Sequence, residues 1–239
     1  MSSAAETKVL AVLEPVLLVA VPVVLVGCAA FNVENTALLT LLTVTAALVP
    51  FFFRFEKSHP KPRDIMPIVV LAAMAAVGRI IFAPFPDFKP VTAIVIVAAV
   101  TFGKESGFLV GALSALASNM FFGQGPWTPW QMYAWGLIGY LAGVLYERGF
   151  FERKNFVYVY GFVAAIFYGF ILDSWYIVGF INPLTMRAVL LGYGAGLPFS
   201  LIHATSTVLF LIPLFGPWTR KLARIKVKYG LVSAPRDSE

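Results

Sequence analysis

The sequence predicts an all-α fold, a polytopic membrane helix bundle of about eight transmembrane helices, and three observations lead to it. Hydrophobic residues make up 59% and charged residues 13% of the 239 residues, whereas a soluble domain has about 25% charged and roughly 45–50% apolar residues. Apolar runs recur at close to the ~20 residues that a spanning helix requires. These runs lack strand-like alternation, and in lipid a helix satisfies its own backbone hydrogen bonds. We therefore expect no soluble domain of any size.

Eight apolar runs are the candidate spans, and the fourth is the shortest. Phe88 and Pro90 before it, and Lys104 after it, would extend its effective reach toward the headgroups. The runs cover residues 9–30, 37–53, 65–83, 91–103, 106–122, 131–146, 156–180 and 195–215.

Basic residues predict the orientation of the chain. They gather in the loop 54–63, in the loop 147–154 and in the tail after Pro217, while the intervening loops hold few. With eight spans, all three clusters fall on one side of the membrane, which the positive-inside rule makes cytoplasmic. We therefore expect a multi-pass protein of the cell membrane with both termini in the cytoplasm. The net charge of +6 is then a property of the membrane edges, and no nucleic-acid partner is expected.

The N-terminal segment contains the single cysteine of the chain. Residues 25–28, Leu-Val-Gly-Cys, resemble the cleavage box of a lipoprotein signal, but Glu6 and Glu14 are out of place in a signal peptide. We expect Cys28 to be packed in a helix instead. One cysteine also excludes a disulfide within the chain.

Motifs of hydrolytic or nucleotide-dependent enzymes are missing from the sequence. It contains no HExxH, no GxSxG and no Walker A loop. The two histidines, His59 in the basic loop and His203 in the last span, cannot form a metal cluster with one cysteine. We expect no intrinsic cofactor and no ATP hydrolysis by this chain, and we expect His203 to be a hydrogen-bonded packing residue.

Small residues at four-residue spacing mark positions where helix backbones can approach closely in a membrane. Such faces form either packing contacts within the bundle or docking surfaces for a partner protein. They comprise Ala72 and Ala76 in the third span, which Gly78 follows two residues on, Gly107, Gly111 and Ala115 in the fifth, and Gly139 and Gly143 in the sixth.

Ionisable residues inside spans are candidates for function. Arg79 lies near the outer end of the third span, and Asp173 lies in the outer half of the seventh. A charge in a span costs about 2.5–3.5 kcal/mol on the insertion scale, so it usually faces the bundle or a water-filled cavity. The alternative is that the two residues pair with each other and serve structure alone.

The outer loop 119–131 combines aromatic side chains with amides. Two glycines and two prolines restrict it to a compact turn that carries Trp127, Trp130 and Gln124, and Asn119 precedes it. Small-molecule sites combine aromatic walls with a few polar groups in this way. The alternative is an aromatic belt at the membrane interface, but a belt does not need the two amides.

Three segments together resemble the substrate-binding S-component of energy-coupling factor (ECF) vitamin transporters, and the closest similarity is to members that take up cobalamin. They are residues 72–79 (AAMAAVGR), residues 88–93 (FKPVTA) and residues 108–130 (FLVGALSALASNMFFGQGPWTPW). The resemblance implies a six-helix substrate-binding core at residues 65–215. Residues 1–64 are then an N-terminal extension of two helices and a basic loop, and residues 216–239 a basic cytoplasmic tail.

The resemblance implies that the chain captures a vitamin at the extracellular face, with cobalamin as the first candidate. It would then dock on a transmembrane T-component that carries two ATPases, with membrane lipid around it. The family's docking face implies a docking role for Ala72 and Ala76. The substrate-binding residues implied by position are Asn119, Gln124, Trp127, Trp130, Arg79, Asp173 and Tyr176. Other substrates, such as a queuosine precursor or another vitamin, remain open, as do an intramembrane enzyme and a structural membrane protein.

Overall fold

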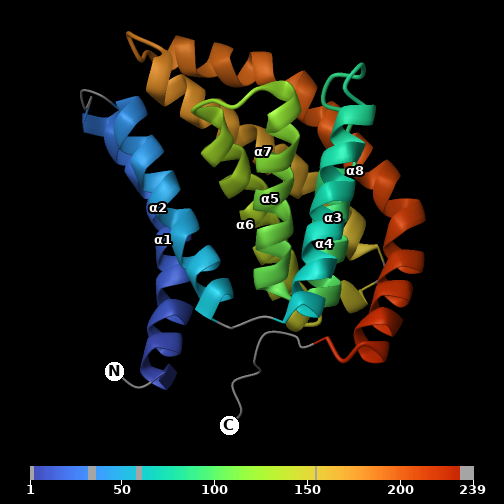
Figure 1. Ribbon diagram of the computed structural model, residues 1–239. Coiled ribbons are helices and arrows are strands. Elements are labelled where there is room, and N and C mark those ends of the chain that lie inside the picture. The colour runs from blue at the N-terminus through green and yellow to red at the C-terminus, as the bar shows by residue number, and fades with distance from the viewer. Residues whose placement is uncertain (1–2, 32–35, 58–60, 154, 232–239) are drawn as a thin grey trace.

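A computed structural model describes residues 3–31, 36–57, 61–153 and 155–231 of the chain. Within these residues the secondary structure is entirely helical (Figure 1). His59 and residues 233–239 lie outside the described residues. The helices are α1 (Ser3–Phe31), α2 (Thr36–Lys57), α3 (Pro62–Ile81), α4 (Val91–Phe102), α5 (Lys104–Phe122), α6 (Trp127–Glu147), the 3-10 helix η1 (Phe150–Glu152), α7 (Phe156–Phe180) and α8 (Met186–Lys228).

The predicted fold class, a polytopic membrane bundle, is confirmed. Five of the described helices, α1, α2, α3, α7 and α8, are long and apolar enough to cross a membrane. Helices α5 and α6 have 19 and 21 residues and are not among these five. Much of their surface faces other helices rather than lipid, because both have long buried faces.

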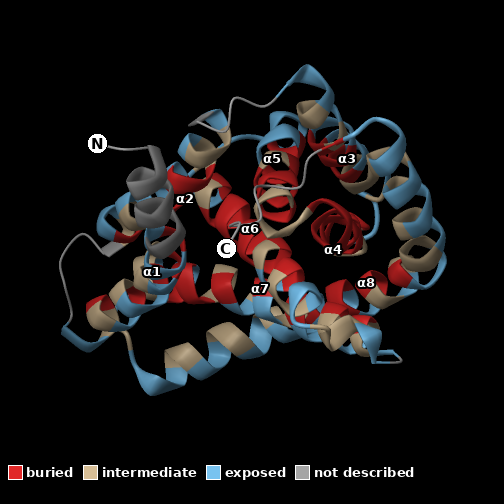
Figure 2. Ribbon diagram, turned by 90° about the horizontal axis from the view of Figure 1, so that it is seen from below, coloured by how far each residue is buried: buried red, intermediate tan, exposed pale blue. Residues whose placement is uncertain are grey.

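Helix α4 lies inside the bundle, and this explains why the fourth apolar run is short. Its 12 residues are all buried (Figure 2), and it packs against α3, α5, α6 and α8. Twelve residues make a helix about 18 Å long, well below the hydrocarbon thickness of about 30 Å. The predicted helix therefore exists, but it is too short to cross the membrane alone. Gly103, at φ +97°, makes the turn into α5 with a backbone conformation that favours glycine.

Helices α5 and α6 approach backbone to backbone through the small residues that the sequence singled out. A side chain on Gly139 would collide with the backbone of Gly107, and one on Gly111 would collide with the backbone of Trp135. The prediction of close helix contacts is therefore confirmed, and in α5 and α6 these contacts lie within the chain.

The N-terminal helices α1 and α2 form a hairpin beside α6 and α7 (Figure 1, blue). Buried Glu14 of α1 accepts a hydrogen bond of 3.0 Å from Arg54 of α2, and Arg54 also lies 3.5 Å from Glu105 of α5. Phe51 stacks on Phe108 with ring centroids 3.6 Å apart. Cys28 is free and buried, as expected of a packed cysteine.

The two ends of the bundle differ in charge. At one end, called the basic end, Lys104 pairs with Glu147 at 3.3 Å and Lys226 donates to the carbonyl of Thr101 at 3.0 Å. The opposite end, called the loop end, carries the α3–α4 loop (residues 82–90) and the α5–α6 loop (residues 123–126) (Figure 1). Helix α8 passes over the loop end before it descends (orange to red). Its continuation to Lys228 makes residues 216–228 helical, where the sequence suggested a separate tail.

The cytoplasmic orientation of the basic end stays a prediction, which cysteine labelling checks. In a Cys28→Ala background, cysteines at the exposed positions Arg153 and Arg224 should resist an impermeant thiol reagent in intact cells. A cysteine at Pro126, which is exposed at the loop end, should react. All three positions should react in detergent. If Arg153→Cys and Arg224→Cys are labelled in intact cells and Pro126→Cys is protected, the orientation is the opposite of the predicted one.

Candidate functional site

Arg79, in the last turn of α3, is the hub of the polar contacts at the loop end. Its Nη1 donates to Ser118 Oγ at 2.6 Å and to Asn119 Oδ1 at 2.8 Å. Its guanidinium lies 4.7 Å from the ring centroid of Phe122 and 5.2 Å from that of Trp135. No carboxylate of the described residues forms an ion pair with it, so the alternative pairing with Asp173 does not occur. The cation is held by neutral groups.

Asn119 and Gln124 hold the α5–α6 loop in place. The buried amide of Asn119 donates to Thr128 Oγ1 at 2.9 Å and to Gln131 Oε1 at 2.8 Å. Thr128 in turn donates to Gln124 Oε1 at 2.9 Å, and Gln124 donates to the carbonyl of Leu116 at 2.9 Å. These bonds use both amides within the chain. Their predicted contact with a substrate stays a prediction.

The two predicted tryptophans do not lie together. Trp127 is 40% exposed at the start of α6, beside Gly125. Trp130 is fully buried and stacks on Trp175 of α7 with centroids 6.0 Å apart. It lines an apolar cavity of about 330 Å³ between α1, α6 and α7, so the two rings do not form the walls of one site.

Asp173 and Tyr176 of α7 also lie apart from Arg79. Asp173 is half-buried, and its carboxylate occupies the space where a side chain on Gly196 of α8 would stand. Tyr176 is 57% exposed and stacks on Phe180 with centroids 5.9 Å apart. The structure joins neither residue to the Arg79 contacts.

A second cation, which the sequence reasoning missed, also lies close to the ring of Trp135. Lys89, at the end of the α3–α4 loop, pairs with Asp87 at 2.5 Å. Its Nζ lies 5.7 Å from the ring centroid of Trp135 and 5.4 Å from that of Tyr168. Burial lowers the pKa of the Lys89 ammonium, and the Asp87 carboxylate opposes that shift. The cation is thus held against aromatic faces.

Trp135, Tyr168 and His203 form the aromatic part of this arrangement. Trp135 stacks on Tyr168 with ring centroids 4.5 Å apart. Tyr168 and His203 form a T-shaped pair with ring centroids 5.1 Å apart. Thr92 Oγ1 of α4 lies 2.9 Å from His203 Nε2 and accepts from Trp135 Nε1 at 3.2 Å. The expectation that His203 is a hydrogen-bonded packing residue is confirmed. We call Arg79, Lys89, Trp135, Tyr168 and His203 the cation–aromatic cluster.

The hydroxyl of Tyr168 is buried within the cluster and has no hydrogen-bond partner among the described residues. A buried polar group without a partner costs about 1–3 kcal/mol, so this hydroxyl is a marker of an incomplete site. The cluster also has a charge imbalance. Among the described residues, Lys89 is paired with Asp87, but Arg79 forms no ion pair with a carboxylate. The sequence carried one signal for this cluster, since the segment 88–93 contains both Lys89 and Thr92.

Ala72 and Ala76 of α3 are 4% and 5% exposed, and Ser114 of α5 donates to the carbonyl of Ala72 at 3.5 Å. They lie at the edge of an exposed apolar stripe on the same helix, formed by Val69, Ala73 and Val77 at helical spacing. A docking role for the two alanines stays a prediction. In this structure the surface open to a partner is the stripe beside them.

Comparison with known proteins adds a family relationship. Residues 63–218 match the family described as the substrate-specific component of ECF transporters. UPF0397 proteins of Aliivibrio fischeri and Aliivibrio salmonicida are 28% identical to this chain over 119 residues. These matches cover 45% of the chain and 63% of each relative, so the chain spans less than two thirds of their length. No solved structure shows a significant match.

Proposed function

The chain belongs to the family of substrate-specific components of ECF transporters, and from this premise we propose that it captures a vitamin at the loop end for uptake into the cell. Cobalamin is the first candidate. The observation that carries the proposal is the unpartnered hydroxyl of Tyr168, whose ring stacks on Trp135 and lies 5.4 Å from Lys89 Nζ. A substrate with a flat face and a hydrogen-bonding anionic group would complete the contacts that these side chains leave open.

The α3–α4 loop is the entrance in this proposal. Lys89 and Asp87 come from the loop, whereas Trp135, Tyr168 and His203 come from α6, α7 and α8. Ser206 Oγ of α8 accepts a hydrogen bond from the backbone N–H of Lys89 and donates one to the carbonyl of Lys89, both at 3.4 Å. Hydrogen bonds of this length are weak, so lifting the loop would cost mainly the contacts of Lys89 with the Trp135 and Tyr168 rings and the packing of Phe88 on Phe210. Substrate would enter beneath it, and Lys89 would close on the substrate as the loop returns.

Cobalamin suits the chemistry of the cluster. Its corrin ring offers a flat face for the pair Trp135 and Tyr168, and its phosphodiester offers an anionic group for Arg79 and Lys89. Charge-assisted hydrogen bonds of this kind are roughly twice as strong as neutral ones. A queuosine precursor or another vitamin is the alternative substrate for the same site.

Uptake requires partners in this proposal, because the chain has no nucleotide-binding motif. We assign ATP hydrolysis to two partner ATPases and docking to a transmembrane T-component. The exposed stripe of Val69, Ala73 and Val77, with Ala72 and Ala76 at its edge, provides small and apolar side chains of the kind that membrane helices use to approach each other.

Tyr168→Phe tests the site with little risk to folding. The substitution removes a buried hydroxyl that has no partner in the free protein, so the melting temperature should stay the same or rise. Cyanocobalamin binding, measured by isothermal titration calorimetry on purified protein, should weaken about 5- to 30-fold, because one substrate hydrogen bond is lost. Tyr158→Phe is the matched control, since Tyr158 lies on the same helix but in its first turn, at the basic end.

The two parts of the proposal fail in different ways. If the parent protein does not bind cyanocobalamin, cobalamin is the wrong substrate, and mass spectrometry of the small molecule that co-purifies with the parent identifies the right one. If the parent binds and Tyr168→Phe binds equally well, the cation–aromatic cluster is not the binding site. Cobinamide lacks the phosphodiester, so the parent should bind it more weakly than it binds cobalamin. The affinity of Arg79→Gln for cobinamide should be about the same as that of the parent.

A further inference from the structure

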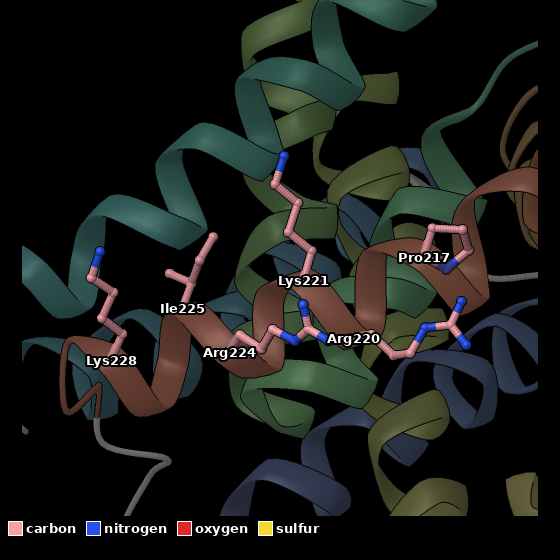
Figure 3. Close-up of a pocket in the computed structure, with 6 residues that line it drawn as sticks. All are labelled: Pro217, Arg220, Lys221, Arg224, Ile225 and Lys228. Carbon is pink, nitrogen blue, oxygen red and sulfur yellow. The ribbon is translucent and has the colours of Figure 1, made fainter.

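The last turns of α8 present a row of basic side chains at the basic end. Arg220, Lys221, Arg224 and Lys228 line a pocket of about 460 Å³ together with Pro217 and Ile225 (Figure 3). The spacing of 220, 224 and 228 places these three on one face of the helix. All four basic residues are exposed.

These charges are not neutralised within the described part of the chain. None of the four forms an ion pair with a described carboxylate, and Lys228 lies over the ring of its neighbour Tyr229 at 5.4 Å. At the same end, by contrast, Lys104 is paired with Glu147. The pocket therefore offers unpaired positive charge to an anionic group.

An apolar groove adjoins this basic pocket. It lies between α3 and α8, has a volume of about 560 Å³, and shares Lys221 and Ile225 with the pocket. Its walls include Met66, Val70 and Met74 of α3 and Leu222 of α8. Met66, Val70 and Met74 are strongly exposed, so the groove is open along its length and continuous with the basic pocket.

We propose that this combined pocket binds an anionic phospholipid, with its phosphate on Arg220, Lys221 and Arg224 and one acyl chain in the α3–α8 groove. An inorganic anion would leave the groove empty, and an uncharged lipid would leave the basic residues without a partner. An anionic phospholipid satisfies both, and membrane leaflets supply it at the depth where spans end and basic clusters begin. The site is separate from the cation–aromatic cluster, and the proposal does not depend on the transported substrate.

Native mass spectrometry of the purified full chain tests the proposal. Delipidated protein is titrated with dioleoyl-phosphatidylglycerol or with dioleoyl-phosphatidylcholine, which has the same acyl chains. The parent should bind the first lipid about tenfold better than the second, as expected when a few basic residues contact an anionic headgroup. Arg220→Gln with Arg224→Gln should abolish this preference. Arg148→Gln with Arg153→Gln, the same charge change outside the pocket, should retain it.

A second variant tests the acyl chain. Val70→Trp places a bulky ring in the groove and leaves the basic residues in place, so it should reduce the retention of phosphatidylglycerol several-fold. Equal binding of the two lipids by the parent would overturn the proposal. So would loss of preference in both double variants alike, because that result reflects net charge alone. If Val70→Trp has no effect on retention, the acyl chain does not lie in the groove and the proposed site is wrong.

Discussion

Arg54→Met should lower the free energy of unfolding by about 3–5 kcal/mol, the range seen when one partner of a buried ion pair is removed. Arg54 is the only cation of the described residues that contacts Glu14, whose carboxylate is buried in the middle of α1, and it also approaches Glu105 of α5. Its loss leaves Glu14 without a counter-ion. It also removes the contact between Arg54 of the N-terminal hairpin and Glu105 of α5. Chemical or thermal unfolding of purified protein in detergent measures the change.

Two comparisons make this result specific. Lys104→Met breaks an ion pair at the same end of the bundle, with side chains 29% and 49% exposed, and should cost less than about 1 kcal/mol. Arg54→Met combined with Glu14→Leu should recover most of the stability, because no buried charge remains unpaired on α1. Equal destabilisation by Arg54→Met and Lys104→Met would show that the buried pair does not anchor the hairpin.

Gly139→Ala should destabilise the protein strongly, although it adds only one methyl group. The added carbon would collide with the backbone of Gly107, and backbone atoms cannot move aside as a side-chain end can. Overpacking of this kind typically costs about 1–3 kcal/mol, and here it would push α5 away from α6. Since α5 carries Ser118 and Asn119, which hold Arg79, and α6 carries Trp135, substrate binding should fall with stability.

Gly194→Ala is the matched control for this prediction. Gly194 also lies in a helix, α8, but a Cβ there meets no atom within 4 Å, so the substitution should be neutral or stabilise the protein by up to about 1 kcal/mol. Unfolding in detergent and calorimetric binding measure the two variants side by side. If Gly139→Ala retains the parent's stability, α5 and α6 are not in backbone contact.

The sequence by itself determined the class of the fold and much of the helix packing. Its composition and run lengths excluded a soluble domain, and its apolar runs located the helices. Small residues could be assigned to close contacts because only glycine or alanine lets two backbones approach, and Gly107, Gly111 and Gly139 do so. Arg79 was found for a similar reason, since a charge in a span has to be buried among polar or aromatic partners.

The tertiary structure alone decided which of these side chains meet. Lipid is as apolar as a protein core, so hydropathy does not tell which face of a helix turns inward, and it could not separate Trp127 from Trp130 or distinguish enclosed α4 from a span. The cation–aromatic cluster joins Arg79, Lys89, Trp135, Tyr168 and His203, which come from α3, the following loop, α6, α7 and α8. No local pattern links positions so far apart in the chain. Their contacts depend on the rotation of each helix about its axis, and packing at the buried faces sets that rotation.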